Sequence, residues 1–313
     1  MALTLGAPMT NLLLYIVSVL IWGSTWLAIE FQLGVVAIEV SLAYRYLLAA
    51  AVAFAWCVLS GRTLRFDRRA HRDFALMGAF MFGFNYIAAY AAQIYITSAL
   101  NAISFSAMVW MNIINARIFL GTPVDRTTLL GAGLGLGGIF VIFWPEVQNL
   151  SMSDAVLVGA CLSLTGALLA SFGNIVSQTA QRRGLPVMPS AAWGMLYGGL
   201  LNTAIAAARG QPLDFDPSPA YVASLLFLAV FGSVVAFGCY LTLLGRIGAG
   251  RAGYSMVMIP IVALILSAAF EGLSLDLHIL AGAALALTGN AAILAQGRRE
   301  RRARRRLMSE AES

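Results

Sequence analysis

The sequence contains no lysine, only two histidines and only three cysteines. All 20 basic residues are arginine, so the lysine of a P-loop and a Schiff-base lysine are both excluded, and the chain is not expected to hydrolyse ATP. The cysteines lie within apolar runs, where neither a disulfide framework nor a CxxC-type metal site is expected. The histidines fall in or beside loops, which argues against a buried histidine relay. We therefore expect no catalytic residue, metal ion or cofactor.

Charge is also scarce. Charged residues make up 11% of the chain and hydrophobic residues 60%, against about 25% and roughly 45–50% in a soluble domain. The net charge of +6 is accounted for by an arginine-rich end, which makes a nucleic-acid partner unnecessary. Residues 1–10 carry no basic residue, and the apolar run that follows is long enough to cross a bilayer, so it is expected to be a retained helix rather than a cleaved signal.

Apolar runs long enough to span a bilayer recur along the whole chain. A helix satisfies its own backbone hydrogen bonds in lipid, whereas an open strand does not, so each run is expected to be helical. The sequence therefore predicts an all-α integral membrane protein with ten transmembrane helices. They lie near residues 11–30, 40–59, 74–96, 99–120, 127–144, 154–180, 187–208, 220–244, 250–270 and 276–296.

Arginine placement predicts how these helices are oriented. All arginines except Arg45 and Arg209 lie in or beside loops that fall on one side of the ten predicted spans, while the opposite loops are rich in Asp and Glu. Arginine collects in cytoplasmic loops. Both termini are therefore predicted to be cytoplasmic, in a multi-pass protein of a bacterial inner membrane. The basic tail, residues 298–313, is expected to lie on anionic lipid.

The two halves of the sequence resemble each other. When the chain is shifted by 151 residues, residues 119–138 align without a gap with residues 270–289, and nine of those twenty positions are identical. Because five helices are an odd number, the second half must enter the membrane upside down relative to the first. Residues 1–148 and 149–297 are thus predicted to be two inverted five-helix repeats, a construction typical of secondary transporters.

Several segments of the chain match a family pattern in order and spacing. They are IWGSTWLAIEFQLG (21–34), AYRYLLAA (43–50), QIYITSALNAISFSA (93–107), MIPIVALILSAAFEG (258–272) and LAGAALALTGN (280–290). On these segments the chain resembles the EamA family of the drug/metabolite transporter superfamily, over nearly its whole length, and it is similar to amino acid exporters of the YddG type. The family's frequent proline in the fourth helix is absent here, and Gly121-Thr122 replaces its usual Gly-Glu pair.

Polar and aromatic side chains recur at helical spacing in several of the predicted spans. Residues three or four apart lie on one face of a helix, and polar faces avoid lipid, so these stripes predict a solute path inside the bundle. The same side chains can instead hydrogen-bond neighbouring helices together, which leaves a structural role open for each. The path candidates are Trp22, Trp26, Tyr86, Tyr90, Gln93, Asn101, Ser104, Trp110, Asn112, Asn174, Gln178 and Tyr254.

Arg45 is predicted to lie inside the second span, where a charge is costly. One alternative is that it snorkels to the headgroups or pairs with Glu30 or Glu39, and the other is that it attracts a carboxylate or closes an external gate. Gly253 and Pro260 are candidate hinge residues in the ninth span, because proline removes a backbone donor. Glycines of the fifth and tenth spans are expected at the pseudo-twofold axis or at a homodimer contact.

The function predicted from these features is secondary, non-ATP transport by alternating access. The resemblance implies export of amino acids or related small metabolites. The expected partners are a small-molecule substrate, membrane lipids and, in a homodimer, a second copy of the chain, with no nucleic acid. A lipid flippase and a carrier of drug cations or nucleotide sugars remain alternatives. An integral-membrane enzyme is disfavoured, because the sequence has no DDxxD or HExxH motif and no serine with a histidine inside its apolar runs.

Overall fold

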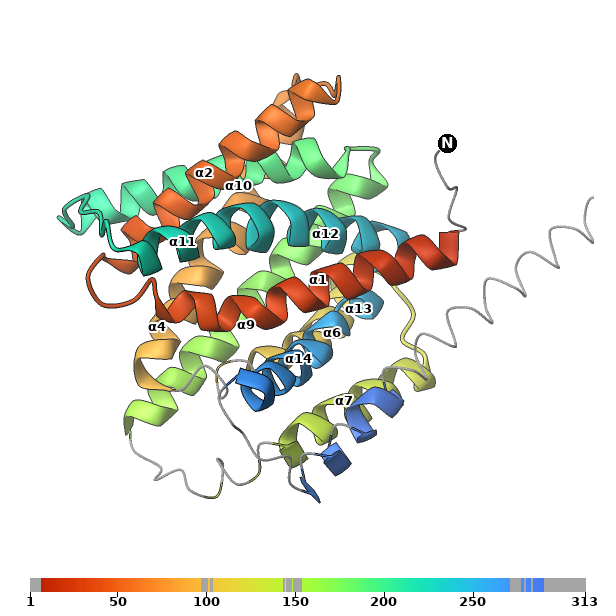
Figure 1. Cartoon of the computed structure of the whole chain (residues 1–313). Helices are drawn as coiled ribbons and strands as arrows, with labels where there is room; N and C mark the ends of the chain where they lie inside the picture. The colour runs from red at the N-terminus through yellow and green to blue at the C-terminus, as the bar shows by residue number, and fades with distance from the viewer. Residues whose placement is uncertain are drawn as a thin grey trace, which may run out of the picture.

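The computed structural model describes residues 7–96, 101, 104–142, 144, 148, 154–270, 277–278, 280–282 and 284–289. This part of the chain consists of helices and turns, with no strand, and Figure 1 shows the helices packed side by side. The elements are α1 (Ala7–Glu30), α2 (Ile38–Leu59), α3 (Arg68–Met77), η1 (Gly78–Phe84), α4 (Asn85–Tyr95), α6 (Met108–Leu120), α7 (Arg126–Ile142), α9 (Asp154–Arg182), α10 (Val187–Ala208), α11 (Pro219–Phe227), η2 (Leu228–Val235), α12 (Ala236–Ile247), α13 (Ala249–Ala252) and α14 (Ser255–Phe270).

Five stretches of the described residues are long and apolar enough to cross a membrane. They coincide with five of the predicted spans, and α10 fills a sixth with its 22 residues. Residues 104–120 and 280–289 form shorter apolar helices. The chain is thus a protein with several apolar helices, whereas the total of ten stays a prediction because parts of the last spans lie outside the described residues. The five stretches are Met9–Glu30, Ile38–Leu59, Arg68–Tyr95, Ala155–Arg182 and Pro219–Ile247.

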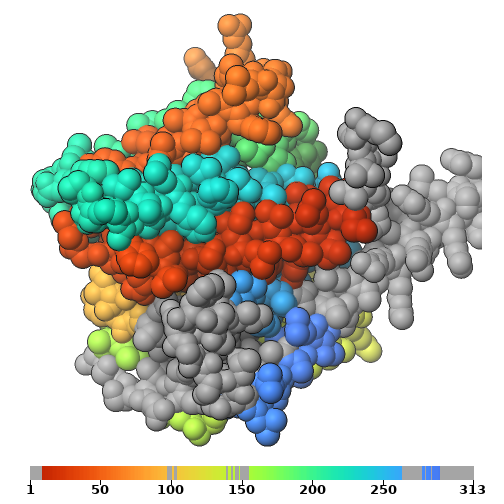
Figure 2. All heavy atoms as spheres, viewed as in Figure 1, coloured from red at the N-terminus to blue at the C-terminus, as the bar shows by residue number. Residues whose placement is uncertain are grey.

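α1 shows the polarity expected of a helix in lipid. Leu13, Leu20 and Leu27, seven residues apart, are 50%, 54% and 55% exposed, and α1 forms a broad stripe across the face seen in Figure 2. Its opposite face buries Ser18 and Thr25. Because the apolar side chains face outward and the polar ones inward, the outer face suits contact with lipid, and the inner face lies against other helices.

Two of the spans contain a π-helical segment, which the sequence patterns did not predict. η1 separates α3 from α4, and η2 separates α11 from α12. A π-helix uses i→i+5 hydrogen bonds and is frequent at functional sites. The third and eighth spans are therefore continuous helices with a locally wider turn at mid-length.

The predicted ninth span is broken at one of its two candidate hinges. α13 ends at Ala252, a turn follows at Gly253, and α14 then continues through Pro260. Proline cannot donate to the carbonyl four residues earlier, and that carbonyl, of Met256, accepts a hydrogen bond from Ser106 Oγ at 3.4 Å. A side chain from outside the helix thus takes the place of the missing backbone donor, so the helix does not end at Pro260.

The helices pack closely where glycine removes side-chain bulk. α2 packs along α10, and α1 lies between α12 and α14 (Figure 1). A Cβ on Gly78 would lie 2.7 Å from the carbonyl oxygen of Gly194 and 2.9 Å from the amide of Gly198, so η1 and α10 touch through their backbones. Such close approach is typical of membrane helices, which gain little from burying apolar side chains against each other.

Candidate functional site

Arg45 of α2 lies at the centre of the helices, with 1% of its surface exposed. Its Nε donates to Ser233 Oγ of η2 at 3.1 Å, and its Nη1 donates to Tyr90 Oη of α4 at 3.1 Å. The guanidinium carbon lies 4.7 Å from the ring centre of Tyr86 and 5.2 Å from that of Tyr46, close enough for cation–π attraction. Three helices far apart in the sequence therefore hold this cation.

The alternative that Arg45 snorkels or pairs with Glu30 or Glu39 is wrong. Glu39 forms an ion pair with Arg209, and Glu30 Oε1 accepts a hydrogen bond from Gln93 Nε2 at 2.8 Å. Among the described residues, no carboxylate forms an ion pair with Arg45. Burial prevails because neutral hydroxyls and ring faces surround the guanidinium, and these replace part of its hydration.

A chain of aromatic rings leads away from Arg45. The ring centre of Tyr46 lies 5.3 Å from that of Phe82, which lies 4.9 Å from that of Phe237. Phe237 in turn lies 4.9 Å from Trp22, and Trp22 lies 5.0 Å from Tyr240. These edge-to-face and tilted ring pairs connect α1, α2, η1 and α12. They form one continuous buried row of aromatic rings that joins the first half of the sequence to the second.

Trp22 also makes a polar contact. Its Nε1 donates to the carbonyl oxygen of Gly232 in η2 at 3.0 Å. A Cβ on Gly232 would lie 3.0 Å from Thr25 and 3.6 Å from Arg45 Nη2. The absence of a side chain at Gly232 thus brings the π-helical backbone against both α1 and the guanidinium.

Two asparagines lie at the far end of the ring chain. Asn174 Nδ2 of α9 is 3.0 Å from Tyr240 Oη and 3.2 Å from Asn112 Oδ1 of α6, and it donates to both. Asn112 is fully buried, and its Nδ2 has no hydrogen-bond partner among the described residues. A Cβ on Gly253 would lie 2.8 Å from that nitrogen, so the glycine leaves room for it.

These side chains form one connected group, which we call the central cluster. Its members come from α1, α2, η1, α4 and α6 in the first half of the sequence and from α9, η2 and α12 in the second. They are Trp22, Arg45, Tyr46, Phe82, Tyr86, Tyr90, Asn112, Asn174, Ser233, Phe237 and Tyr240.

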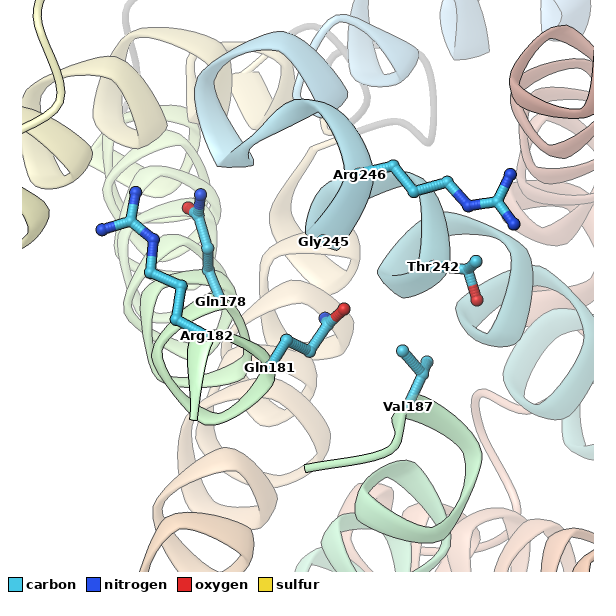
Figure 3. Close-up of a pocket in the computed structure, with 7 residues that line it drawn as sticks. All are labelled: Gln178, Gln181, Arg182, Val187, Thr242, Gly245 and Arg246. Atoms are coloured by element: carbon cyan, nitrogen blue, oxygen red, sulfur yellow. The ribbon is translucent and has the colours of Figure 1, made fainter. Parts of the chain in front are cut away.

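A cavity of about 320 Å³ opens where α9, α10 and α12 meet, at the end of these helices that carries Arg182 and Arg246. In Figure 3 the carboxamide of Gln181 points toward Thr242, while the guanidinium groups of Arg182 and Arg246 point away from the centre. Arg246 Nη1 donates to Asn11 Oδ1 of α1 at 3.2 Å. The cavity is therefore lined by both polar and apolar groups, from Gln178, Gln181, Thr242, Val187 and Gly245, and its two arginines are directed away from the centre.

Three of the predicted path residues make hydrogen bonds to neighbouring elements, and one of them, Gln178, also lines this cavity. Asn101 Nδ2 donates to the carbonyl of Ala89 at 2.8 Å, and Gln178 Oε1 accepts from the amide of Ala249 at 3.1 Å. Tyr254 Oη donates to a backbone carbonyl of α7 at 2.5 Å. The sequence left open that such residues hydrogen-bond neighbouring elements. These three contacts are hydrogen bonds of that kind.

The contacts that define the central cluster include five predicted path residues, Trp22, Tyr86, Tyr90, Asn112 and Asn174, but not Trp26, Gln93, Ser104 or Trp110. Trp26 packs edge-on against Phe105 with ring centres 5.8 Å apart, and Gln93 is tied to Glu30. Ser104 and Trp110 are half-buried.

The cluster contains residues that the stripes did not identify. Ser233, Phe237 and Tyr240 recur at steps of four and three, a helical signal present in the sequence. It was missed because two of the three are aromatic and resemble ordinary core residues. Tyr46 and Phe82 belonged to none of the polar stripes, since Phe82 lies among apolar residues and Tyr46 is next to Arg45 but has no polar residue three or four positions away.

The chain matches the model of the EamA-like transporter family twice, at residues 9–144 and 157–295. It is 26% identical to the uncharacterized inner membrane transporter YedA of Escherichia coli K12 over 259 residues, which cover 82% of this chain and 81% of the relative. It is 22% identical to the uncharacterized transporter YoaV of Bacillus subtilis over 82% of this chain and 87% of the relative. It is 23% identical to the protein PagO of Salmonella typhimurium over 85% and 86%.

A solved crystal structure has the same fold. It superimposes with a TM-score of 0.77 over 92% of this chain and 98% of that chain, at 17% sequence identity. At that identity the likeness concerns the fold alone.

Proposed function

The chain belongs to the EamA-like transporter family, and from this premise we propose that it is a secondary transporter that exports amino acids or related small metabolites by alternating access. Family and relatives indicate a membrane transporter rather than an enzyme. The several apolar helices fit a multi-pass protein of the inner membrane. Contacts between the described residues support the substrate class and the alternating mechanism.

The central cluster is the observation that carries the proposal. It combines a buried cation, neutral amide groups and aromatic faces between helices that come from both parts of the sequence. An amino acid carries a carboxylate, an ammonium group and a side chain, and these are the groups that such donors, acceptors and rings bind. Pockets that bind small molecules combine apolar walls with a few convergent polar groups in the same way.

Reciprocal glycine contacts support an inverted repeat. A Cβ on Gly138 would lie 2.5 Å from the carbonyl oxygen of Gly282, and a Cβ on Gly289 would lie 2.7 Å from that of Gly131. A shift of 151 residues converts Gly131 into Gly282 and Gly138 into Gly289, so the two contacts exchange with each other. A pseudo-twofold axis between α7 and the segment Leu280–Gly289 accounts for this exchange.

The π-helical segments support the same repeat. Shifted by 151 residues, the range Gly78–Phe84 becomes 229–235, which falls within η2 (Leu228–Val235). The same shift places α2 on α10. Their contacts are exchanged accordingly, because α2 contacts η2 and α10 contacts η1. We therefore assign residues 1–148 and 149–297 to the two repeats and residues 298–313 to a basic cytoplasmic tail, which lies outside the described residues.

Ion pairs near opposite ends of the helices support an alternating mechanism. Arg183, just after α9, pairs with Asp73 of α3 at the end of the helices that carries the cavity, and Arg209, just after α10, pairs with Glu39 of α2 at the other end. Both pairs join a helix of one repeat to a helix of the other. In the proposed cycle each repeat rocks against its partner, and the cavity at Gln181 is the inner mouth through which a solute enters.

The test is flux through liposomes that contain the purified protein, with a panel of labelled amino acids. We expect saturable efflux, and we expect Asn112→Ala and Asn174→Ala each to lower it about tenfold, because each removes amide groups worth roughly 1–2 kcal/mol. The matched control is Thr165→Val, an exposed position of α9 whose hydroxyl donates to the carbonyl of Cys161 in the same helix. Flux equal to that of empty liposomes for every amino acid would contradict the proposal.

A further inference from the structure

Arg45 is a buried cation whose charge is only partly compensated. Arginine stays protonated in proteins, and burial of an ion is costly unless a counter-charge or several hydrogen bonds replace its water. The two neutral oxygens of Ser233 and Tyr90 are its hydrogen-bond partners among the described residues, and they engage Nε and Nη1. Two ring faces add cation–π attraction, but no carboxylate of the described residues forms an ion pair with it.

The surroundings of Arg45 offer further donors rather than acceptors. Tyr90 Oη accepts from Arg45, which leaves its own hydrogen free to donate. The hydroxyl of Tyr46, a residue with none of its surface exposed, has no hydrogen-bond partner among the described residues. Ser233 Oγ donates to the carbonyl of Leu228 at 2.9 Å and is thereby fixed as an acceptor for the guanidinium. A guanidinium edge and two tyrosine hydroxyls suit an oxyanion.

We propose that Arg45, with the hydroxyls of Tyr46 and Tyr90, binds the carboxylate of the transported solute. This inference rests on the proposed function and names the chemical group that a substrate must carry. A guanidinium fork matches the geometry of a carboxylate, and the solute's negative charge supplies the counter-ion that the described residues do not. The adjoining rings of Phe82, Phe237 and Trp22 then receive an apolar or aromatic side chain.

One cation favours a monocarboxylate over a more highly charged ligand. The chain has no lysine, and Arg182 and Arg246 stand at the rim of the inner cavity rather than in the central cluster. Amines that lack a carboxylate meet an uncompensated positive charge at this site, so they are expected to be excluded.

The site is closed in this structure, since Arg45 is almost fully buried. η2 lies directly beside it, because its π-helical turn is bonded to Trp22 through Gly232 and to Arg45 through Ser233. A shift of this turn separates the two contacts and opens the guanidinium edge to a solute. The carboxylate of the solute then binds Arg45 as the protein changes from this closed conformation to an open one.

Binding to the purified full-length protein tests the inference independently of flux. The probes are phenylalanine, 3-phenylpropionate and 2-phenylethylamine, measured by calorimetry and by thermal shift. We expect the two carboxylates to bind and the amine not to bind. Arg45→Gln is expected to weaken carboxylate binding by at least about 30-fold, as for loss of a buried charge-assisted pair. The matched control is Arg117→Gln, an exposed arginine of α6, which is expected to leave binding unchanged.

Conservative variants keep the test valid if Arg45→Gln does not fold. Tyr46→Phe and Tyr90→Phe retain the rings and the cation but remove one hydroxyl each, and each is expected to weaken binding of 3-phenylpropionate about three- to tenfold. Equal binding of amine and carboxylates, or carboxylate binding that none of the three variants weakens, would overturn the inference. So would inorganic phosphate competing more strongly than 3-phenylpropionate.

The two proposals fail in different ways. Carboxylate binding that depends on Arg45, together with no flux of any amino acid, leaves this site standing and rejects the transport proposal. Flux that Arg45→Gln does not change and that carries 2-phenylethylamine as fast as phenylalanine rejects the carboxylate site and leaves transport standing.

Discussion

Gly138→Ala is expected to destabilise the fold through a backbone collision. The new methyl group would lie 2.5 Å from the carbonyl oxygen of Gly282, 2.6 Å from the amide of Ala286 and 2.8 Å from its Cβ. Two of these are backbone atoms, which cannot rotate away, so α7 and the segment Leu280–Gly289 must separate by roughly 1 Å. Overpacking of this kind costs about 1–3 kcal/mol.

The measurement is thermal unfolding of the purified protein in detergent. A cost of about 1–3 kcal/mol corresponds to a Tm lower by roughly 2–10 °C. Gly133→Ala is the matched control, because it lies on the same helix and a Cβ there meets no atom within 4 Å. Alanine is the better helix former, so this control is expected to keep or slightly raise Tm.

The symmetry-related contact, between Gly289 and Gly131, provides a second test of the same argument. Gly289→Ala places a methyl group 2.7 Å from the carbonyl oxygen of Gly131 and is expected to cost a similar amount. If both substitutions force the same helix separation, the double variant Gly138→Ala/Gly289→Ala loses less stability than the two single losses together. A Tm of Gly138→Ala equal to that of Gly133→Ala would refute the backbone-contact argument.

Three further predictions concern single contacts. Trp22→Phe keeps a ring but removes the donor to the carbonyl of Gly232, so flux in liposomes is expected to fall about fivefold, and unchanged flux would contradict a role for that bond. Asp73→Asn leaves Arg183 without its ion-pair partner and is expected to lower the free energy of unfolding by about 1–2 kcal/mol; a smaller loss in 1 M salt than in dilute buffer checks its electrostatic origin. Tyr254→Phe removes a hydrogen bond to α7 and is expected to lower Tm while flux per folded molecule stays the same, which separates a packing role from a path role.

The sequence was sufficient to locate most of the described helices, because long apolar runs and the cost of open backbone in lipid leave little choice. It also identified Tyr86, Tyr90, Asn112 and Asn174, whose helical spacing sets polar groups on one face. All four belong to the central cluster.

The role of each polar residue was not predictable from the same spacing. Asn101 and Asn112 both lie in the predicted span 99–120, yet Asn101 donates to a backbone carbonyl, whereas Asn112 accepts through Oδ1 from the side chain of Asn174. The difference depends on which helix packs opposite each residue. Arg45 illustrates the same limit, because its acceptor, Ser233, lies 188 residues further along the chain.

η2 couples two parts of one span in a way that a plain α-helix does not. An i→i+5 turn takes up one residue more than an i→i+4 turn, and one residue corresponds to about 100° of rotation in an α-helix. The π-helical turn therefore sets the angular phase between α11 and α12. If it relaxed to α-helical geometry, Phe237 and Tyr240 would swing around the helix axis while α11 kept its place. A change of this turn to α-helical geometry would therefore rotate the aromatic face of α12 relative to α11 and lengthen the span by about 1.5 Å, the rise of one residue.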